Sequence, residues 1–405
     1  MNTGDTAFML IATAMVMLMT PGLALFYGGL VRSKNVLGTI MHSMVCLGVV
    51  TLIWILYGYS IAFGPDSNGL LGDLSLLGLN GVSLGPGPYS KTIPDLLFCA
   101  FQLMFAIITP ALISGAIAER MKFSAYLLFI ALWSTLVYLP ICHWVWGGGW
   151  LGKMGALDFA GGTVIHINSG VAALVAAIVL GKRKGWGRES FHPHNLPMTI
   201  LGAGLLWFGW FGFNAGSALA ANETAALAFF TTQVATGAAV LSWLAVEWLV
   251  QKKPTTLGAV SGALAGLVAI TPGAGFVSPL SALLIGLAAG AICYLAVLAK
   301  SKLGYDDALD VVGVHGVGGL WGALATGLFS SSAINPAAAN GLFFGNPHQF
   351  LVQAIGAGAA ILYSLVFTYV ILKVVALMTG GLRLDLEDEI QGLDLTQHSE
   401  VGYTS

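Results

Sequence analysis

Charged residues are scarce in this 405-residue chain: they make up only 8% of it, against 57% hydrophobic residues. An ordinary soluble domain carries roughly 25% charged residues, so this chain has too few to cover a water-exposed surface. The mean hydropathy is +0.85, and long apolar stretches recur along the chain. The composition therefore excludes a soluble protein and predicts an all-α integral membrane protein, because helices satisfy their own backbone hydrogen bonds in lipid.

Cysteine is also scarce, and the net charge is only −2. The cysteines lie in apolar runs without CxxC spacing, so we expect buried apolar side chains rather than disulfides or a zinc site: Cys46, Cys99, Cys142 and Cys293. The near balance of charge indicates no nucleic-acid partner. Since no HExxH motif occurs, we expect no metal, no cofactor and no enzyme activity. The N-terminus lacks the positive flank of a signal peptide, so the first apolar run is interpreted as a retained span.

The apolar runs predict about eleven transmembrane helices followed by a short tail. We expect a transmembrane domain over residues 1–379 and a C-terminal tail over residues 380–405. A segment at 64–94, rich in Gly, Pro and Ser, is interpreted as an ordered loop. The predicted spans lie near residues 6–30, 37–63, 95–118, 123–144, 163–181, 196–218, 224–250, 257–276, 279–299, 309–330 and 349–379.

Basic residues are distributed unevenly between the loops. Alternate connections and the end of the chain hold all but two of the 16 basic residues, the exceptions being Lys91 and Lys153. Short cytoplasmic loops retain Lys and Arg. This bias predicts an N-terminus outside the cell and a tail in the cytoplasm. The tail carries six of the 18 acidic residues, and its composition is compatible both with a partly disordered end and with a regulatory segment.

The chain divides into two sets of five spans, about 6–181 and 196–330, before a final long helix. Because five is odd, the second set is expected to run inverted, as in many transporters. His166 lies in the fifth span and His315 in the tenth, each among small residues that allow helices to approach closely. A lone membrane histidine is more often a helix-packing hydrogen bonder. Two at matching positions favour a polar pathway, suited to a small solute that can donate and accept hydrogen bonds.

Several motifs together resemble the ammonium transporter (Amt/MEP/Rh) family, and most closely its bacterial Amt branch. They span most of the chain, in the order expected for that family. The motifs are PGLALFYGGLVRSKNV at 21–36, FQLMFAIITPALISGAIAER at 101–120, HWVWGGGWL at 143–151, ALDFAGGTVIHINSG at 156–170, GWFGFNAGSA at 209–218 and DVVGVHGVGGLWG at 310–322.

This resemblance implies roles for individual residues. Phe105, Trp146 and Ser217 would form an external site that recruits ammonium, supported by the buried acid Asp158. Phe105 and Phe213 would stack as a gate. The remaining pore residues would be the paired imidazoles and two aromatic neighbours: His166, His315, Trp210 and Tyr27. From the residues alone the aromatics could equally pack the helices, Ser217 could bond its own helix backbone, and Asp158 could cap a helix.

The resemblance implies a channel for ammonium or ammonia, with methylammonium as a further candidate substrate, in a homotrimer with one pore per subunit. We favour an electrogenic mechanism in which the proton crosses separately. It also implies a PII-type signalling protein at the cytoplasmic face, a multi-pass location in the inner (plasma) membrane and contact with lipid. Two alternatives remain open: an ammonium sensor that signals through such a partner, and a neutral-gas channel for ammonia or carbon dioxide.

Overall fold

The computed structural model describes residues 1–403 and is almost entirely helical, which confirms the predicted fold class. Within these residues, ten helices are long and apolar enough to cross a membrane, and α11 is a shorter apolar helix. Six of the long helices are single segments: α1 (Thr3–Leu30), α4 (Asp95–Ile117), α9 (Leu196–Gly216), α10 (Glu223–Gln251), α12 (Pro279–Leu303) and α14 (Pro347–Met378), and the shorter helix is α11 (Thr256–Ile270). Two others are built from several consecutive segments: α2 (Val36–Ile53), η2 (Trp54–Gly58) and α3 (Tyr59–Phe63) form one, and α5 (Phe123–Trp133), η4 (Ser134–Tyr138), α6 (Leu139–Val145) and α7 (Trp150–Met154) form the other. The last two each begin with a π-helical turn: η5 (Gly162–Ile167) precedes α8 (Asn168–Leu180), and η6 (Val312–Val317) precedes α13 (Gly318–Phe329).

The connections carry a few short elements. The segment at 64–94 contains a hairpin of β1 (Asp66–Ser67) and β2 (Leu71–Gly72), in which Asp66 lies opposite Gly72. The other short elements are η1 (Ser33–Asn35), η3 (Leu77–Leu79), η7 (Leu342–Phe344), α15 (Leu386–Gln391) and α16 (Leu393–His398).

One span differs clearly from its predicted bounds. The sequence predicted a helix over 257–276, whereas α11 ends at Ile270 and a turn follows. Pro272 supplies the physical reason, because it lacks the backbone N–H that would continue the helical ladder. The apolar residues after Pro272 therefore form a turn rather than a continuation of the helix.

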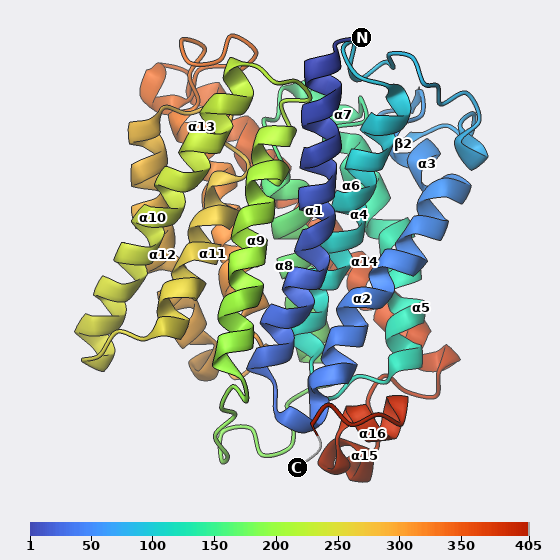
Figure 1. Cartoon of the computed structure of the whole chain (residues 1–405), viewed down its shortest axis with the longest axis vertical. Coiled ribbons are helices and arrows are strands. Elements are labelled where there is room, and N and C mark those ends of the chain that lie inside the picture. Colours follow the sequence, from blue (N-terminus) through green and yellow to red (C-terminus); the bar gives the residue numbers. More distant parts are fainter. Residues whose placement is uncertain (404–405) are drawn as a thin grey trace.

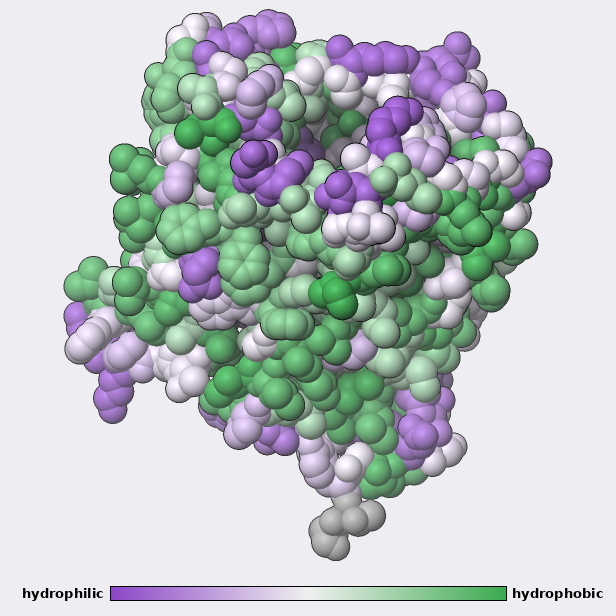
Figure 2. Space-filling view, turned by 45° about the horizontal axis from the view of Figure 1, so that its top comes forward, coloured by the Kyte–Doolittle hydropathy of each residue, from purple (hydrophilic) through white to green (hydrophobic). Residues whose placement is uncertain are grey.

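The helices form a single bundle whose two ends differ in character. The N-terminus lies at one end, here called the N-side, and α15 and α16 lie at the opposite end, the C-side (Figure 1). Helix α1 packs along α9, and α10 packs against α11 and α12. Figure 2 shows green apolar side chains around the middle of the molecule and purple hydrophilic ones gathered at the N-side end, around a hollow.

Buried ion pairs hold the C-side loops together. The Glu119 carboxylate accepts hydrogen bonds from the Arg32 backbone N–H (2.8 Å) and from Arg183 Nη1 (3.1 Å). Arg183 in turn donates through Nη2 to Asp306 at 2.9 Å. Burial alone would raise the pKa of Glu119, but the charge of Arg183 and the contacts with Arg32 outweigh it and lower that pKa below its ordinary value. The carboxylate is therefore ionised at neutral pH, and the pairs join the loops that follow α1, α4, α8 and α12.

The C-terminal tail docks on this network. The Glu389 carboxylate accepts hydrogen bonds from the Lys184 backbone N–H (2.7 Å) and from Arg383 Nη2 (2.6 Å). Asp394 Oδ1 accepts the Gly38 backbone N–H at 2.8 Å. The described part of the tail, residues 380–403, is therefore an ordered segment rather than a free end. Composition could not reveal this order, because it depends on partners far away in the sequence.

Candidate functional site

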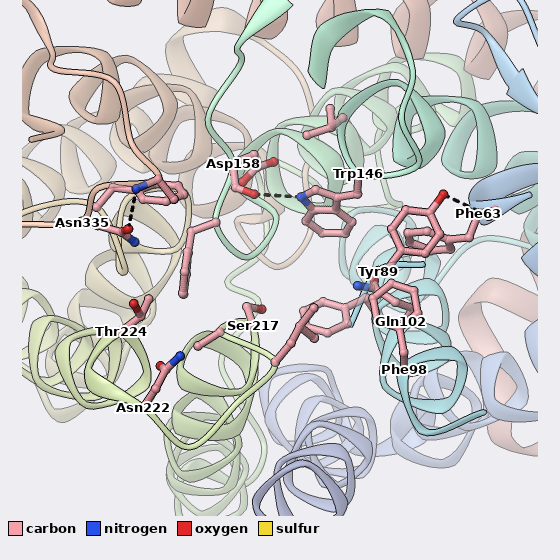
Figure 3. Close-up of a pocket in the computed structure, with 17 residues that line it drawn as sticks. Phe63, Tyr89, Phe98, Gln102, Trp146, Asp158, Ser217, Asn222, Thr224 and Asn335 are labelled. Carbon is pink, nitrogen blue, oxygen red and sulfur yellow. Dashed lines mark hydrogen bonds between the residues drawn. The ribbon is translucent and has the colours of Figure 1, made fainter. Parts of the chain in front are cut away.

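A series of cavities runs through the bundle from the N-side to the C-side. The first, here called the N-side cavity, measures about 450 Å³. It is lined by Phe63, Tyr89, Phe98, Gln102, Phe105, Val145, Trp146, Asp158, Phe159, Ser217, Ala218, Leu219, Asn222, Thr224, Phe276, Asn335 and Ala337. Figure 3 shows Ser217 between two walls, with Trp146, Tyr89 and Gln102 on one and Asn222, Thr224 and Asn335 on the other.

Beyond this cavity the pathway narrows sharply. A cavity of about 10 Å³ is lined by both His166 and His315, and a space of that size has room for about one water molecule. A cavity of about 50 Å³ follows and shares His315 as a lining residue. The next, of about 530 Å³, lies at the C-side and shares Asp310 with the one before it. The shared residues indicate that the narrow cavity and the two cavities on its C-side belong to one interrupted pathway.

The N-side cavity presents hydrogen-bond acceptors and aromatic faces. Trp146 donates its indole N–H to the backbone oxygen of Asp158 at 2.8 Å, so its ring face remains free. The Ser217 hydroxyl donates to the backbone oxygen of Phe213, also at 2.8 Å, which leaves its oxygen lone pairs available. Phe105 lies edge-on to Trp146, with ring centroids 6.0 Å apart. With these donors already used, the site is suited to a cation that carries N–H groups.

Two phenylalanines separate this cavity from the narrow one. The ring centroids of Phe105 and Phe213 lie 4.4 Å apart, and both side chains are buried. Phe105 lines the N-side cavity, whereas Phe213 lines the cavity that holds the histidines. The two rings therefore lie between the N-side cavity and the cavity that holds the histidines.

Asp158 organises the segment between Trp146 and His166. Its carboxylate accepts four backbone N–H groups, from Gly161 (2.9 Å), Gly162 (2.6 Å), Thr163 (2.8 Å) and Val164 (3.0 Å). These donors begin η5, the π-helical turn that carries His166. Since each carboxylate oxygen holds two of them, Asp158 acts on the pathway mainly by fixing the backbone and by its charge.

The two histidines face each other across the narrow cavity. Their Nδ1 atoms lie 3.2 Å apart, and the rings are nearly parallel, with an interplanar angle of 25°. If both rings are neutral, one Nδ1 donates to the other. The second ring then carries its proton on Nε2, while the first has a bare Nε2. The pair therefore offers one donor and one acceptor to a solute in a passage that is otherwise mostly apolar.

The helix that carries His166 and the helix that carries His315 both begin with a π-helical turn. His315 lies in η6, also a π-helical turn, and Asp307 Oδ2 accepts the Val312 N–H at 2.7 Å, much as Asp158 does ahead of His166. Neither π-helical turn was predicted from the sequence. The matched turns place one imidazole from each half of the chain on the same pathway.

The two aromatic neighbours predicted to line the pore occupy different levels. The Trp210 ring stacks on His166, with centroids 5.4 Å apart, and its indole N–H donates to Thr271 Oγ1 at 2.9 Å. Tyr27 lines the next cavity toward the C-side, and its hydroxyl donates to the backbone oxygen of Leu112 at 3.0 Å. The structure thus places Trp210 beside the histidine pair and Tyr27 beyond it.

Glycine residues, which have no side chain, allow the helix that carries His166 to contact the helix that carries His315. A Cβ on Gly170 of α8 would lie 2.2 Å from the backbone of Gly316.

We expect Gly170→Ala to lower the free energy of unfolding by about 1–3 kcal/mol or more, because the two backbones must separate. We also expect this variant to slow transport. Thermal unfolding of the purified protein measures the first effect, with Gly358→Ala as control. Gly358 lies in α14 with no atom within 4 Å of its Cβ position, so an equal loss there would contradict the close approach.

Sequence reasoning missed several residues of the pathway. Gln102, Tyr89 and Phe98 line the N-side cavity, and Asp310 lines both C-side cavities. Gln102 had a visible signal, as a polar residue within an apolar span. Tyr89 lies in a loop, where no periodicity points to a site.

The chain is similar to known proteins over nearly its whole length. Residues 7–403 match the profile of the Ammonium Transporter Family. The ammonium transporter of Bacillus subtilis is 55% identical over 404 residues, which cover 100% of this chain and 99% of that protein. The ammonium transporter of Aquifex aeolicus is 53% identical, covering 100% of this chain and 94% of that protein.

Solved structures have the same fold. The crystal structure of Saccharomyces cerevisiae Mep2 matches with a TM-score of 0.89 and 37% identity, covering 96% of this chain and 89% of that one. A structure titled Sensor Amt Protein matches with a TM-score of 0.89 and 30% identity, covering 98% of each chain.

Proposed function

This chain belongs to the ammonium transporter family, and from that premise we propose how its residues carry ammonium across a membrane. The family is one of transporters rather than enzymes. The observation that carries the proposal is the series of cavities that narrows at the His166–His315 pair. Its N-side end faces the outside of the cell, because the basic residues gather at the C-side.

Recruitment takes place in the N-side cavity. Ammonium binds against the faces of Trp146 and Phe105, and Ser217 accepts one of its N–H groups. The hydrogen bonds that occupy the Trp146 and Ser217 protons support this role, since these two side chains then offer a ring face and a hydroxyl oxygen. The substrate then passes the Phe105 and Phe213 rings.

Ammonium loses a proton before it enters the narrow part of the pore. Moving an intact cation through the membrane centre costs roughly 3 to 17 kcal/mol, depending on the scale. An amine with a pKa near 10.4 needs only about 4 to 5 kcal/mol to lose its proton at pH 7. Neutral ammonia can then exchange hydrogen bonds with His166 and His315, which offer one donor and one acceptor between them.

The proton follows separately, with the histidine pair as its relay. The short Nδ1–Nδ1 distance of 3.2 Å supports transfer between the rings. Transport is then electrogenic, because one charge crosses with each ammonia. Potassium is excluded since it has no proton to release and meets an apolar constriction.

The protein works as a homotrimer in the inner (plasma) membrane, with one pathway in each subunit. A PII-type signalling protein binds the C-side, where the loop at 182–195 and the docked tail form one surface through Lys184 and Glu389. A signalling role is the second candidate, and the likeness to the structure titled Sensor Amt Protein is the observation behind it. In that case flux would be small and the bound partner would report ammonium.

Uptake of isotope-labelled ammonium into proteoliposomes that contain the purified protein tests the proposal. We expect saturable uptake that a large excess of potassium does not inhibit. Protein-free liposomes serve as control for diffusion of ammonia through lipid. Uptake no faster than in these liposomes would contradict transport and favour the signalling role.

A further inference from the structure

One face of helix α4 points three side chains into the N-side cavity. Phe98, Gln102 and Phe105 follow one another at spacings of four and three residues, which places them on one stripe of the helix. Gln102 lies one turn toward the N-side from Phe105, the ring next to Trp146. In Figure 3, Gln102 lies on the same wall of the cavity as Trp146.

The Gln102 amide is the unsatisfied polar group of this wall. The residue is only 8% exposed. Within residues 1–403 its Oε1 atom is buried in the wall of the cavity and has no hydrogen-bond partner. Such an orphaned buried acceptor costs about 1–3 kcal/mol, and exchanging the two ends of the amide turns the oxygen toward the cavity.

The oxygens of two other amides in the same cavity have structural hydrogen bonds. Asn335 donates to the backbone oxygen of Gly275 at 2.8 Å and accepts the Ala337 N–H at 3.0 Å. Asn222 accepts the Ala225 N–H at 3.1 Å, where it caps α10. Structural hydrogen bonds therefore account for these amide oxygens, but not for that of Gln102.

We propose that the Gln102 amide oxygen accepts an N–H of the ammonium recruited in this cavity, which makes Gln102 a specificity-determining residue beside Ser217. This inference rests on the proposed function and adds a second oxygen to its recruitment site. Ammonium has four N–H groups in a tetrahedral arrangement. Two oxygens and the faces of two aromatic rings match them, with Trp146 and Phe105 supplying the rings.

The chemistry of an amide suits this role better than that of a carboxylate. Because an amide can rotate its oxygen and nitrogen ends, a cation selects the orientation in which Oε1 faces it. A neutral acceptor adds directional affinity without the full charge that would hold the cation in the cavity. Potassium gains little from two oxygens, since filters that select it replace its hydration shell with rings of carbonyls.

The test compares two variants with matched changes in proteoliposomes. Gln102→Met keeps the length and removes the acceptor. Gln233→Met makes the same change at an exposed position of α10. We expect Gln102→Met to raise the ammonium concentration for half-maximal transport about tenfold, equivalent to about 1.4 kcal/mol, and to leave the maximal rate unchanged. Gln233→Met should leave both quantities unchanged.

A second variant keeps the test decisive if Gln102→Met does not fold. Gln102→Glu should lower the concentration for half-maximal transport and also lower the maximal rate, because a carboxylate holds the cation more firmly. An unchanged half-maximal concentration in either variant would overturn the inference. So would a loss of maximal rate alone, which indicates a displaced Phe105. If the unaltered protein moves no ammonium, the proposed function itself fails.

Discussion

Replacing Asp158 with alanine is expected to abolish measurable ammonium transport and to destabilise the protein. The carboxylate accepts four backbone N–H groups at 2.6–3.0 Å, in a residue only 8% exposed. If water reaches only some of the freed groups, two that remain unpaired cost about 2 to 6 kcal/mol. The turn that begins η5 would relax, and His166 would move away from His315. Labelled-ammonium uptake and thermal unfolding measure the two effects.

A half-buried acid outside the pathway provides the matched control for this change. Asp73 lies in the N-side loop, where its carboxylate accepts only from Ser75 in the same loop. Asp73→Ala should retain normal uptake and stability. An Asp158→Ala protein that unfolds at the same temperature and transports at the normal rate would show that the four hydrogen bonds do not hold the pathway in place.

His166→Asp is expected to open the pathway to potassium. Histidine gives the pore a neutral donor and acceptor, whereas a carboxylate places a fixed negative charge in an apolar passage. At about 4 Å and an effective dielectric constant of 20, that charge attracts a cation by about 4 kcal/mol. A gain of that size corresponds to an increase in potassium flux of up to about 1,000-fold. Potassium-evoked current in proteoliposomes measures it, against no current with the unaltered protein.

His348→Asp controls for the change of charge itself. His348 is exposed at the N-side start of α14, so a carboxylate there should admit no potassium. Should His166→Asp exclude potassium and carry ammonium at the full rate, the histidine pair would be neither the selective barrier nor the proton relay.

The sequence was sufficient to recognise a bundle of about ten to eleven apolar spans, because lipid demands long apolar helices and these stand out in hydropathy. It also placed both histidines in corresponding spans, since a polar residue in an apolar run is conspicuous. The contacts of Asp158 were harder to foresee. Its four hydrogen bonds go to backbone groups, and backbone groups leave no trace in residue type.

The remaining features depend on contacts between distant segments. Tyr27 was expected to line the pore near the histidines, and helix packing places it in the cavity that also includes His315. The tail has the composition of a solvated end, yet Glu389 meets Lys184 about 200 residues away in the sequence. Neither local periodicity nor charge counting records such pairings.

The most direct test of the account is the current evoked by an ammonium concentration jump on proteoliposomes that contain the purified protein, with potassium as control. The account predicts a transient current for ammonium and none for potassium, because the proton crosses separately from ammonia along the His166–His315 relay. Ammonium uptake without any current would contradict the proton relay and leave a neutral ammonia pathway. A current of equal size for potassium would contradict the requirement for deprotonation.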